Sequence, residues 1–120
     1  MNYDQSGNLL VLSSAAPLVP QLLSTSINVS SSGDNTLITG AKGTIRVMMM
    51  LLVVNTAVNI QFKDGTGGTA LTGVMNMLAN GSLVLDMTSE PWFITSTGNN
   101  FVLNLSAAVQ VSGRVYYAQG

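Results

Sequence analysis

Hydrophobic and polar residues alternate along three stretches in the second half of the chain. Every second residue is apolar in VNIQFK (58–63), and a similar period recurs in FVLNLS (101–106) and VQVSGRVYY (109–117). Val102 is the exception, an apolar residue at a position where the pattern calls for a polar one. A period of two is typical of strands that bury one face. The pattern therefore predicts half-buried strands of antiparallel sheets at these three stretches.

Turn-forming segments separate these stretches at regular intervals. They combine Gly with Asn, Asp or Thr and occupy residues 31–36, 39–44, 64–69, 79–82 and 97–100. The pair Asn80-Gly81 is the strongest hairpin signal, because both residue types tolerate the positive φ of a type I′ turn. It predicts a hairpin that joins VMNML to LVLDM. Since no stretch combines a 3.6-residue period with helix caps, the spacing predicts an all-β fold, either a sandwich or a barrel.

One stretch, RVMMMLLVVN (46–55), does not alternate, because Val47 to Val54 are eight consecutive apolar residues. The run is shorter than the roughly 20 residues of a membrane-spanning helix. Its Val and Leu content and the flanking turn residues favour a strand over an uncapped helix that would be apolar on all sides. One face of that strand would join the core. The other would need cover from a loop, the N-terminal arm or another copy of the chain. The first face would consist of Val47, Met49, Leu51 and Val53. The second face would consist of Met48, Met50, Leu52 and Val54.

The N-terminal segment differs from the rest of the chain. Its sequence NLLVLSSAAPLVPQLLSTSINVSSS has no charge, and it contains Pro17 and Pro20. Two prolines argue against a helix or a central strand but allow an extended arm or an edge strand. We interpret 9–12 and 21–29 as short strands with a proline-bearing connection. The predicted organisation is an N-terminal arm over 1–30 and a β-sandwich domain over 31–120.

Charge is scarce in this chain. Four Lys and Arg residues and five Asp and Glu residues give a net charge of −1. The chain has no basic patch of the kind that nucleic-acid binding requires. Its 47% of hydrophobic residues with low net charge is not the composition of a disordered protein. The N-terminal sequence MNYDQSGNLLVLSSAAP has no basic residue, unlike a secretory signal. We therefore expect neither a nucleic-acid nor a membrane partner.

Residues that carry chemistry are equally scarce. The chain has no His and no Cys, and so lacks the most frequent general base, the commonest metal ligand and the thiolate ligand. Lys42 and Lys63 lie in Gly-rich turns, where a solvated charge is the default. The segment KDGTGGT (63–69) lacks the Lys-Ser/Thr of a P-loop and offers one carboxylate where a calcium loop needs several. Four acidic residues between 34 and 90 form pairs easily by chance. We expect no enzyme activity and no cofactor.

The only tryptophan, Trp92, lies beside Phe93 in EPWFITSTG (90–98). Such a pair is a core anchor when buried, and it can stack on a sugar ring when exposed. We favour a core or subunit contact over a ligand site. A binding module for carbohydrate would use this pair together with Tyr116 and Tyr117.

The succession SGDNTLI, GTIRVMMMLLV, AVNIQFKDG, LANGSLVLD, PWFITSTGNNFVLNLS and VSGRVYY resembles small proteins encoded by tailed bacteriophages. The resemblance covers residues 30–118 and is to head decoration (cement) and head-fibre proteins with a β-sandwich of the jelly-roll type. It implies an oligomer, most often a trimer, on the outside of a capsid where major capsid subunits meet. The N-terminal segment that precedes this range lies outside the resemblance.

Together these observations predict a non-enzymatic viral structural protein with an antiparallel jelly-roll sandwich and an extended N-terminal arm. As a capsid decoration (cement) protein it would be made in the host cytoplasm and would stabilise the shell from the outer capsid surface of the virion. The expected partners are further copies, with a trimer favoured, and the major capsid protein. The alternative is a carbohydrate- or receptor-binding domain of a phage head or tail fibre. The candidate contact residues are Leu10, Leu12, Leu18, Val19, Leu22, Met48, Met49, Met50, Trp92 and Phe93.

Overall fold

The computed structural model describes residues 22–120. The predicted strand 9–12 and the candidate contacts Leu10, Leu12, Leu18 and Val19 lie outside these residues. No helix in the described part is long and apolar enough to cross a membrane. Its elements are β1 (Leu23–Val29), β2 (Gly33–Ile38), the 3-10 helix η1 (Gly40–Lys42), β3 (Ile45–Val54), β4 (Val58–Asp64), β5 (Thr69–Ala70), β6 (Met75–Met77), β7 (Ser82–Leu85), β8 (Phe93–Ile94), β9 (Phe101–Leu105) and β10 (Val111–Gln119).

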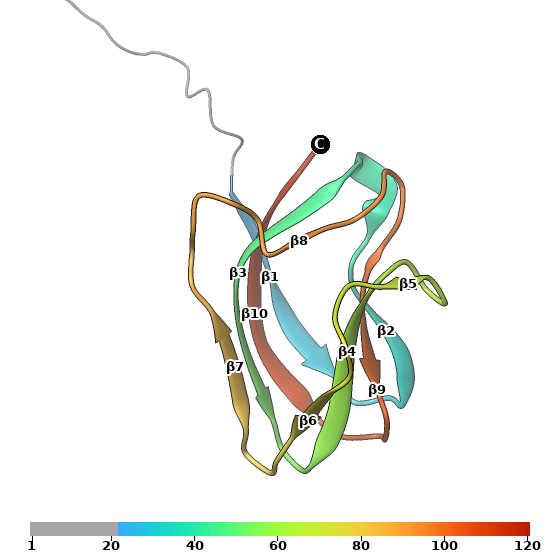
Figure 1. The fold of residues 1–120 in the computed structure, drawn as a ribbon, viewed down its shortest axis with the longest axis vertical. Helices are drawn as coiled ribbons and strands as arrows, with labels where there is room; N and C mark the ends of the chain where they lie inside the picture. The colour runs from blue at the N-terminus through green and yellow to red at the C-terminus, as the bar shows by residue number, and fades with distance from the viewer. Residues whose placement is uncertain (1–21) are drawn as a thin grey trace, which may run out of the picture.

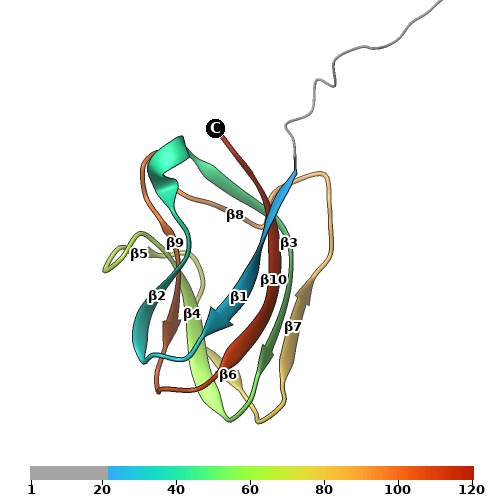
Figure 2. The same ribbon diagram turned by 180° about the vertical axis from the view of Figure 1, so that it is seen from behind.

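The strands form two antiparallel sheets that pack face to face (Figure 1). Sheet A has the order β1-β10-β3-β7, with β8 also paired to β3, and Figure 2 shows its long strands side by side. Sheet B has the order β2-β9-β4-β5, with β6 also paired to β4. The strands β1 to β4 alternate between the sheets, and so do β9 and β10. This order is that of a jelly roll. The predicted all-β sandwich is confirmed.

The core lies between the sheets and is built from the inward-facing residues of the long strands. Three phenylalanines pack together there: the fully buried Phe62 and Phe101 stack with ring centroids 5.3 Å apart, and the ring centroid of the partly buried Phe93 lies 5.1 Å from that of Phe62. Each fully buried apolar side chain contributes about 1.5–3 kcal/mol. The alternation predicted for 58–63, 101–106 and 109–117 is confirmed. The buried apolar residues around the phenylalanines are Ile27, Ile38, Ile45, Val47, Met50, Leu52, Val54, Val58, Ile60, Leu103, Leu105, Val109, Val111 and Val115.

Val102 is fully buried although alternation along β9 points it away from the core. Its neighbours on the adjacent strands are Lys63 and Thr36. Lys63 Nζ lies 3.3 Å from Asp34 Oδ1, so an ion pair spans the outer side of β9 from β4 to β2. The backbone N–H of Gly67 donates to Asp34 Oδ2 at 2.6 Å and brings the turn after β4 to the same place. An apolar residue is stable at Val102 because this turn and ion pair cover it.

A β-bulge at Met48 interrupts the alternation of β3. Tyr116 and Tyr117 are adjacent on β10, yet they lie opposite Met49 and Val47, so Met48 is the extra residue. Because a bulge inserts one residue, every residue beyond it points to the opposite side from the one that simple alternation predicts. The predicted face of Val47, Met49, Leu51 and Val53 is therefore wrong in one member. Val47 lies on the core side, and the other three lie on the outer side.

The turn at Asn80 connects the two sheets. Asn80 has φ 60°, and no other non-glycine residue in 22–120 has a positive φ. The predicted turn is confirmed, but the predicted hairpin is wrong, because β6 pairs with β4 in sheet B and β7 pairs with β3 in sheet A. Gly81 does not have the positive φ that a type I′ turn needs. The turn is instead closed by Gly81 N–H, which donates to the Leu78 carbonyl at 2.8 Å.

Candidate functional site

The outer side of β3 and β7 is an open apolar surface within the described structure. Leu51 and Val53 on β3 are 49% and 38% exposed. Val84 on β7 lies directly opposite Leu51 and is 59% exposed. Met49 is partly buried and continues the row along β3. We call these four residues, Met49, Leu51, Val53 and Val84, the outer stripe.

The other half of the same face is polar. Arg114 on β10 lies beside β1, where its guanidinium donates to the Ser24 hydroxyl at 2.9 Å and to the Ser26 hydroxyl at 3.2 Å. The same guanidinium lies 6.0 Å from the ring centroid of Tyr116. The face is therefore divided lengthwise: β1 and β10 carry hydroxyls and a charge, and β3 and β7 carry the outer stripe.

An apolar groove of about 450 Å³ lies beside the outer stripe, at the end of sheet A where β1 begins. The bulge residue Met48 lines it, and so do Met87, Ser89 and Pro91 of the loop after β7. In Figures 1 and 2 this loop runs beside the start of β1. Trp92 ends this loop, and its indole N–H donates to the Asp86 carbonyl at 2.7 Å. We call this the Met48 groove. It is lined by Leu22, Arg46, Met48, Met87, Ser89, Pro91 and Ala118.

The structure separates the described candidate contact residues into two groups. Leu22 and Met48 meet in the Met48 groove, and Met49 belongs to the outer stripe. Trp92 is 44% exposed. One candidate is corrected. Met50 is 2% exposed, because the bulge leaves it on the core side. Phe93 is partly buried and packs against two phenylalanines of the core.

Sequence reasoning missed two apolar residues of this surface, Val84 and Met87. Both lie in or after β7, a strand whose pairing with β3 was not predicted. Leu83, Val84 and Leu85 are all apolar, so the sequence does not show which face of this strand is covered. Leu51 and Val53 were predicted to share one face of their strand, but the sequence did not show whether that face joins the core or needs cover.

The aromatic residues that the alternative, a carbohydrate-binding module, would use do not share one surface. Phe93 and Tyr117 are partly buried and pack against the core. Tyr116 points to the opposite side of β10, next to Arg114. Trp92 is exposed but lies in the loop after β7. No shared stacking platform for a sugar ring results.

The acidic residues Asp34 and Asp64 hold loops in place. Asp64 accepts hydrogen bonds from the Ser96 N–H at 2.9 Å, the Ser96 hydroxyl at 2.7 Å and the Asn99 amide at 3.2 Å. Partial burial would raise the pKa of Asp64, but these bonds outweigh it and lower the pKa. The Asn104 amide at 2.7 Å, and then the Gly67 N–H, lower the pKa of Asp34. Both carboxylates are therefore charged and bonded at neutral pH, and neither resembles a general acid.

One turn lysine and the possible metal ligands of residues 22–120 complete the account of the charged side chains. Lys63, which the sequence places in a Gly-rich turn, pairs with Asp34. Residues 22–120 contain no cluster of three His, Cys, Asp or Glu side chains that could hold a metal ion.

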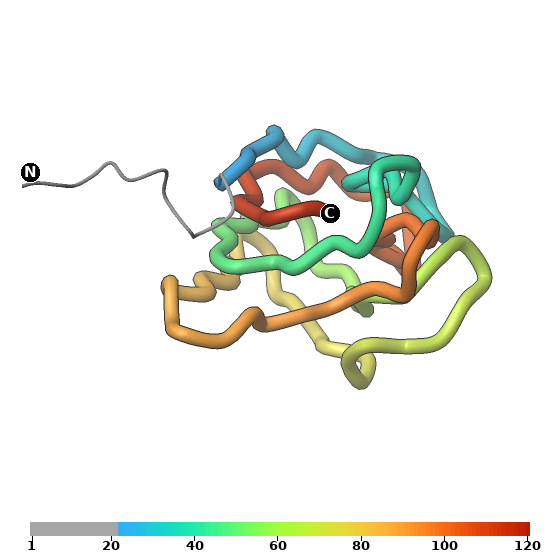
Figure 3. Tube along the Cα trace, turned by 90° about the horizontal axis from the view of Figure 1, so that it is seen from above, coloured from blue at the N-terminus to red at the C-terminus, as the bar shows by residue number. Residues whose placement is uncertain are grey.

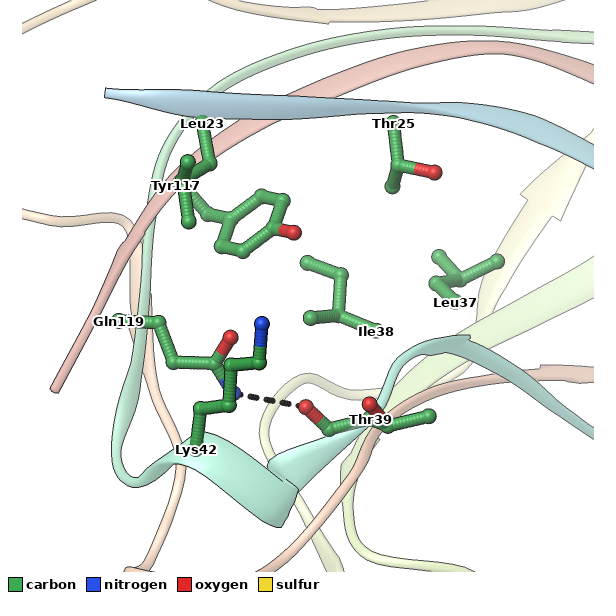
Figure 4. A pocket seen from close by; sticks show the side chains of 8 residues that line it. All are labelled: Leu23, Thr25, Leu37, Ile38, Thr39, Lys42, Tyr117 and Gln119. Carbon is green, nitrogen blue, oxygen red and sulfur yellow. Dashed lines mark hydrogen bonds between the residues drawn. The ribbon is translucent and has the colours of Figure 1, made fainter. Parts of the chain in front are cut away.

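A second pocket, of about 390 Å³, opens between β1 of sheet A and β2 of sheet B (Figure 4). It combines an apolar wall with the amine of Lys42 and the hydroxyl of Tyr117. The amide of Gln119 donates to the Thr39 carbonyl at 2.7 Å and closes one side. The lining residues are Leu23, Thr25, Leu37, Ile38, Thr39, Lys42, Tyr117 and Gln119.

No family model and no curated protein matches this chain. Among solved structures, the chain is similar to a protein of Bacillus endospore appendages, which form a novel family of disulfide-linked pili. The two chains are 15% identical, with a TM-score of 0.45, over 92% of this chain and 100% of that chain. At this level of similarity the likeness supports no argument about function. The comparisons show no phage decoration family, so that resemblance stays a prediction.

Proposed function

We propose that this protein is a non-enzymatic structural protein that assembles with further copies of itself through the outer face of sheet A. The observation that carries the proposal is the outer stripe, with Leu51 and Val84 side by side and about half exposed. A contiguous apolar patch on a folded surface marks an interaction site, because water is released when another surface covers it.

The Met48 groove extends this surface. It is lined mainly by apolar side chains, and it includes Leu22, the first described residue. The sequence over 9–21 leads directly to Leu22 and carries no charge. It contains four leucines and valines before Pro17 and two between Pro17 and Pro20. Under this proposal the arm adds apolar area to the same contact.

The finer role we propose is that of a capsid decoration (cement) protein on the outer surface of a phage head. It is supported by the resemblance of residues 30–118 to that group of proteins. The mechanism would be mechanical: copies that contact one another and the major capsid protein would clamp the shell against expansion. A trimer is the favoured state under this proposal. A neutral surface rich in hydroxyl and amide groups suits such packing, because it imposes little charge repulsion between copies.

Electron cryomicroscopy of the particles of the virus that encodes this chain tests the role. The expected result is density for the jelly roll on the outer surface of the shell, with the outer stripe of each copy covered by a neighbour. Particles that lack the chain by mass spectrometry would overturn the decoration role. Particles that contain it with the outer stripe facing solvent would overturn the assembly surface.

A further inference from the structure

We propose that the pocket between β1 and β2 binds a small aliphatic carboxylate, at a site distinct from the assembly surface. Two polar groups from different elements meet there above an apolar wall (Figure 4). Lys42 comes from η1 and Tyr117 from β10. The site does not involve the outer stripe or the Met48 groove, so the inference does not depend on assembly.

The polar end of the pocket is made by hydrogen-bond donors. Figure 4 shows the Lys42 amine and the Tyr117 hydroxyl pointing toward the middle of the pocket. Within residues 22–120 the Lys42 ammonium has no carboxylate partner, whereas Lys63 pairs with Asp34. An ammonium is only a donor, and a phenol donates readily to an anion. A carboxylate accepts at both oxygens, and a charge-assisted bond is about twice as strong as a neutral one.

The apolar end comes from the two sheets. Leu23 projects from β1, while Leu37 and Ile38 come from β2. Ile38 is 5% exposed and forms part of the core, so this wall is fixed. The pocket volume of about 390 Å³ is small for a ligand site. Small-molecule sites begin at roughly 300 Å³ and reach roughly 1,000 Å³. The volume therefore favours a short aliphatic chain over a long one.

The turn that presents Lys42 is fixed by several bonds. Gly43 N–H donates to the Gly40 carbonyl at 3.1 Å, and Gly40 N–H donates to Asn100 Oδ1 at 2.9 Å. A Cβ at Gly40 would overlap the Asn99 carbonyl, so the turn packs directly on that loop. The end of the chain runs beside the same turn (Figure 3), where Gly120 N–H donates to the Thr44 carbonyl at 3.1 Å. A site built on a fixed turn loses less entropy when a ligand binds.

Isothermal titration calorimetry of the full chain with sodium octanoate tests the proposal. Wild-type protein should bind octanoate, and octan-1-ol, which has the same apolar chain without the charge, should bind at least about tenfold more weakly. Lys42→Gln should weaken octanoate binding by about tenfold or more, and Tyr117→Phe by roughly threefold to tenfold. Lys42→Arg keeps the charge and should retain most of the affinity.

Arg46→Gln is the matched control, since Arg46 is the cation of the Met48 groove. It should leave octanoate binding unchanged. The proposal is wrong if wild-type protein binds no octanoate, if Arg46→Gln weakens binding more than Lys42→Gln does, or if octan-1-ol binds as tightly as octanoate. Sedimentation of the same samples separates this result from assembly, because Lys42→Gln should leave the assembly state unchanged.

Discussion

Val47 and Met50, separated by two residues on β3, both point into the core between the sheets and are 0% and 2% exposed. The bulge at Met48 makes this possible, because it inserts one residue opposite the adjacent pair Tyr116 and Tyr117. Met48 and Met49 are consequently both only partly buried. A run of apolar residues is thereby divided between the core and a surface that another copy can cover.

The first prediction concerns the different positions of two neighbouring methionines. Met50→Ala should lower the free energy of unfolding by about 2–5 kcal/mol, because it leaves a cavity in the core. Met49→Ala, on the outer side, should cost under about 1 kcal/mol in the monomer. Urea unfolding of both variants, measured under conditions where the protein is monomeric, checks the difference. Equal losses would contradict the bulge.

The second prediction concerns Gly113, which lies on β10 opposite Leu52 of β3. Its φ is 154°, and a Cβ there would overlap the Leu51 carbonyl oxygen. Gly113→Ala should therefore destabilise the fold by about 1–3 kcal/mol or more, because it strains the backbone and displaces the paired strands β10 and β3. Gly73→Ala is the control, because Gly73 is exposed and has no atom within 4 Å of an added Cβ. That variant should change stability by no more than about 0.5 kcal/mol in thermal or urea unfolding.

The third prediction concerns pH. The pKa of Asp34 is lowered in the folded protein by the Asn104 amide and the Gly67 N–H, and that of Asp64 is also lowered. An Asp in the unfolded chain has a pKa of about 3.9, so near and below that pH the unfolded chain binds more protons than the folded protein does. The two carboxylates therefore stabilise the fold fully above that pH. This stabilisation is lost as pH falls through their lowered pKa in the folded protein. Stability should therefore fall as acid is added below about pH 4.

Asp34→Asn tests which group carries this effect. The variant should be less stable than wild type at neutral pH and should lose less stability between about pH 4 and pH 2. The control is Asp86→Asn, an exposed aspartate whose backbone carbonyl, not its side chain, accepts from Trp92. Urea unfolding across this pH range measures the difference. If Asp34→Asn and wild type lost the same free energy of unfolding between about pH 4 and pH 2, Asp34 would not contribute to the acid sensitivity.

Much of the fold could be predicted from the sequence because local chemistry determines it. The strands over 58–63 and 101–106 carry an apolar residue at every core-facing position, because one face of each strand packs against the other sheet. The length and composition of the run at 46–55 indicated a strand, and its lack of a polar face indicated that a second apolar face would need cover.

What could not be predicted depends on partners distant in the sequence. The bulge at Met48 is defined by the pairing with Tyr116 and Tyr117, which belong to the last strand of the chain. Asn80 has the positive φ that its residue type favours, but β6 and β7 then pair with different strands, which no local pattern specifies. Val102 is buried by a turn that is held by an aspartate on another strand.

The most direct test of the proposed assembly is sedimentation velocity of wild-type protein and Val84→Lys at micromolar concentrations. Val84 is the most exposed residue of the outer stripe, so a lysine there should place a charge in the contact without unfolding the monomer. Asn59→Lys, exposed on sheet B, is the control. We expect wild type and Asn59→Lys to sediment as the same oligomer, and Val84→Lys to sediment as a monomer with an unchanged circular dichroism spectrum. A monomeric wild type, or an oligomer that Val84→Lys leaves intact, would contradict the assembly surface.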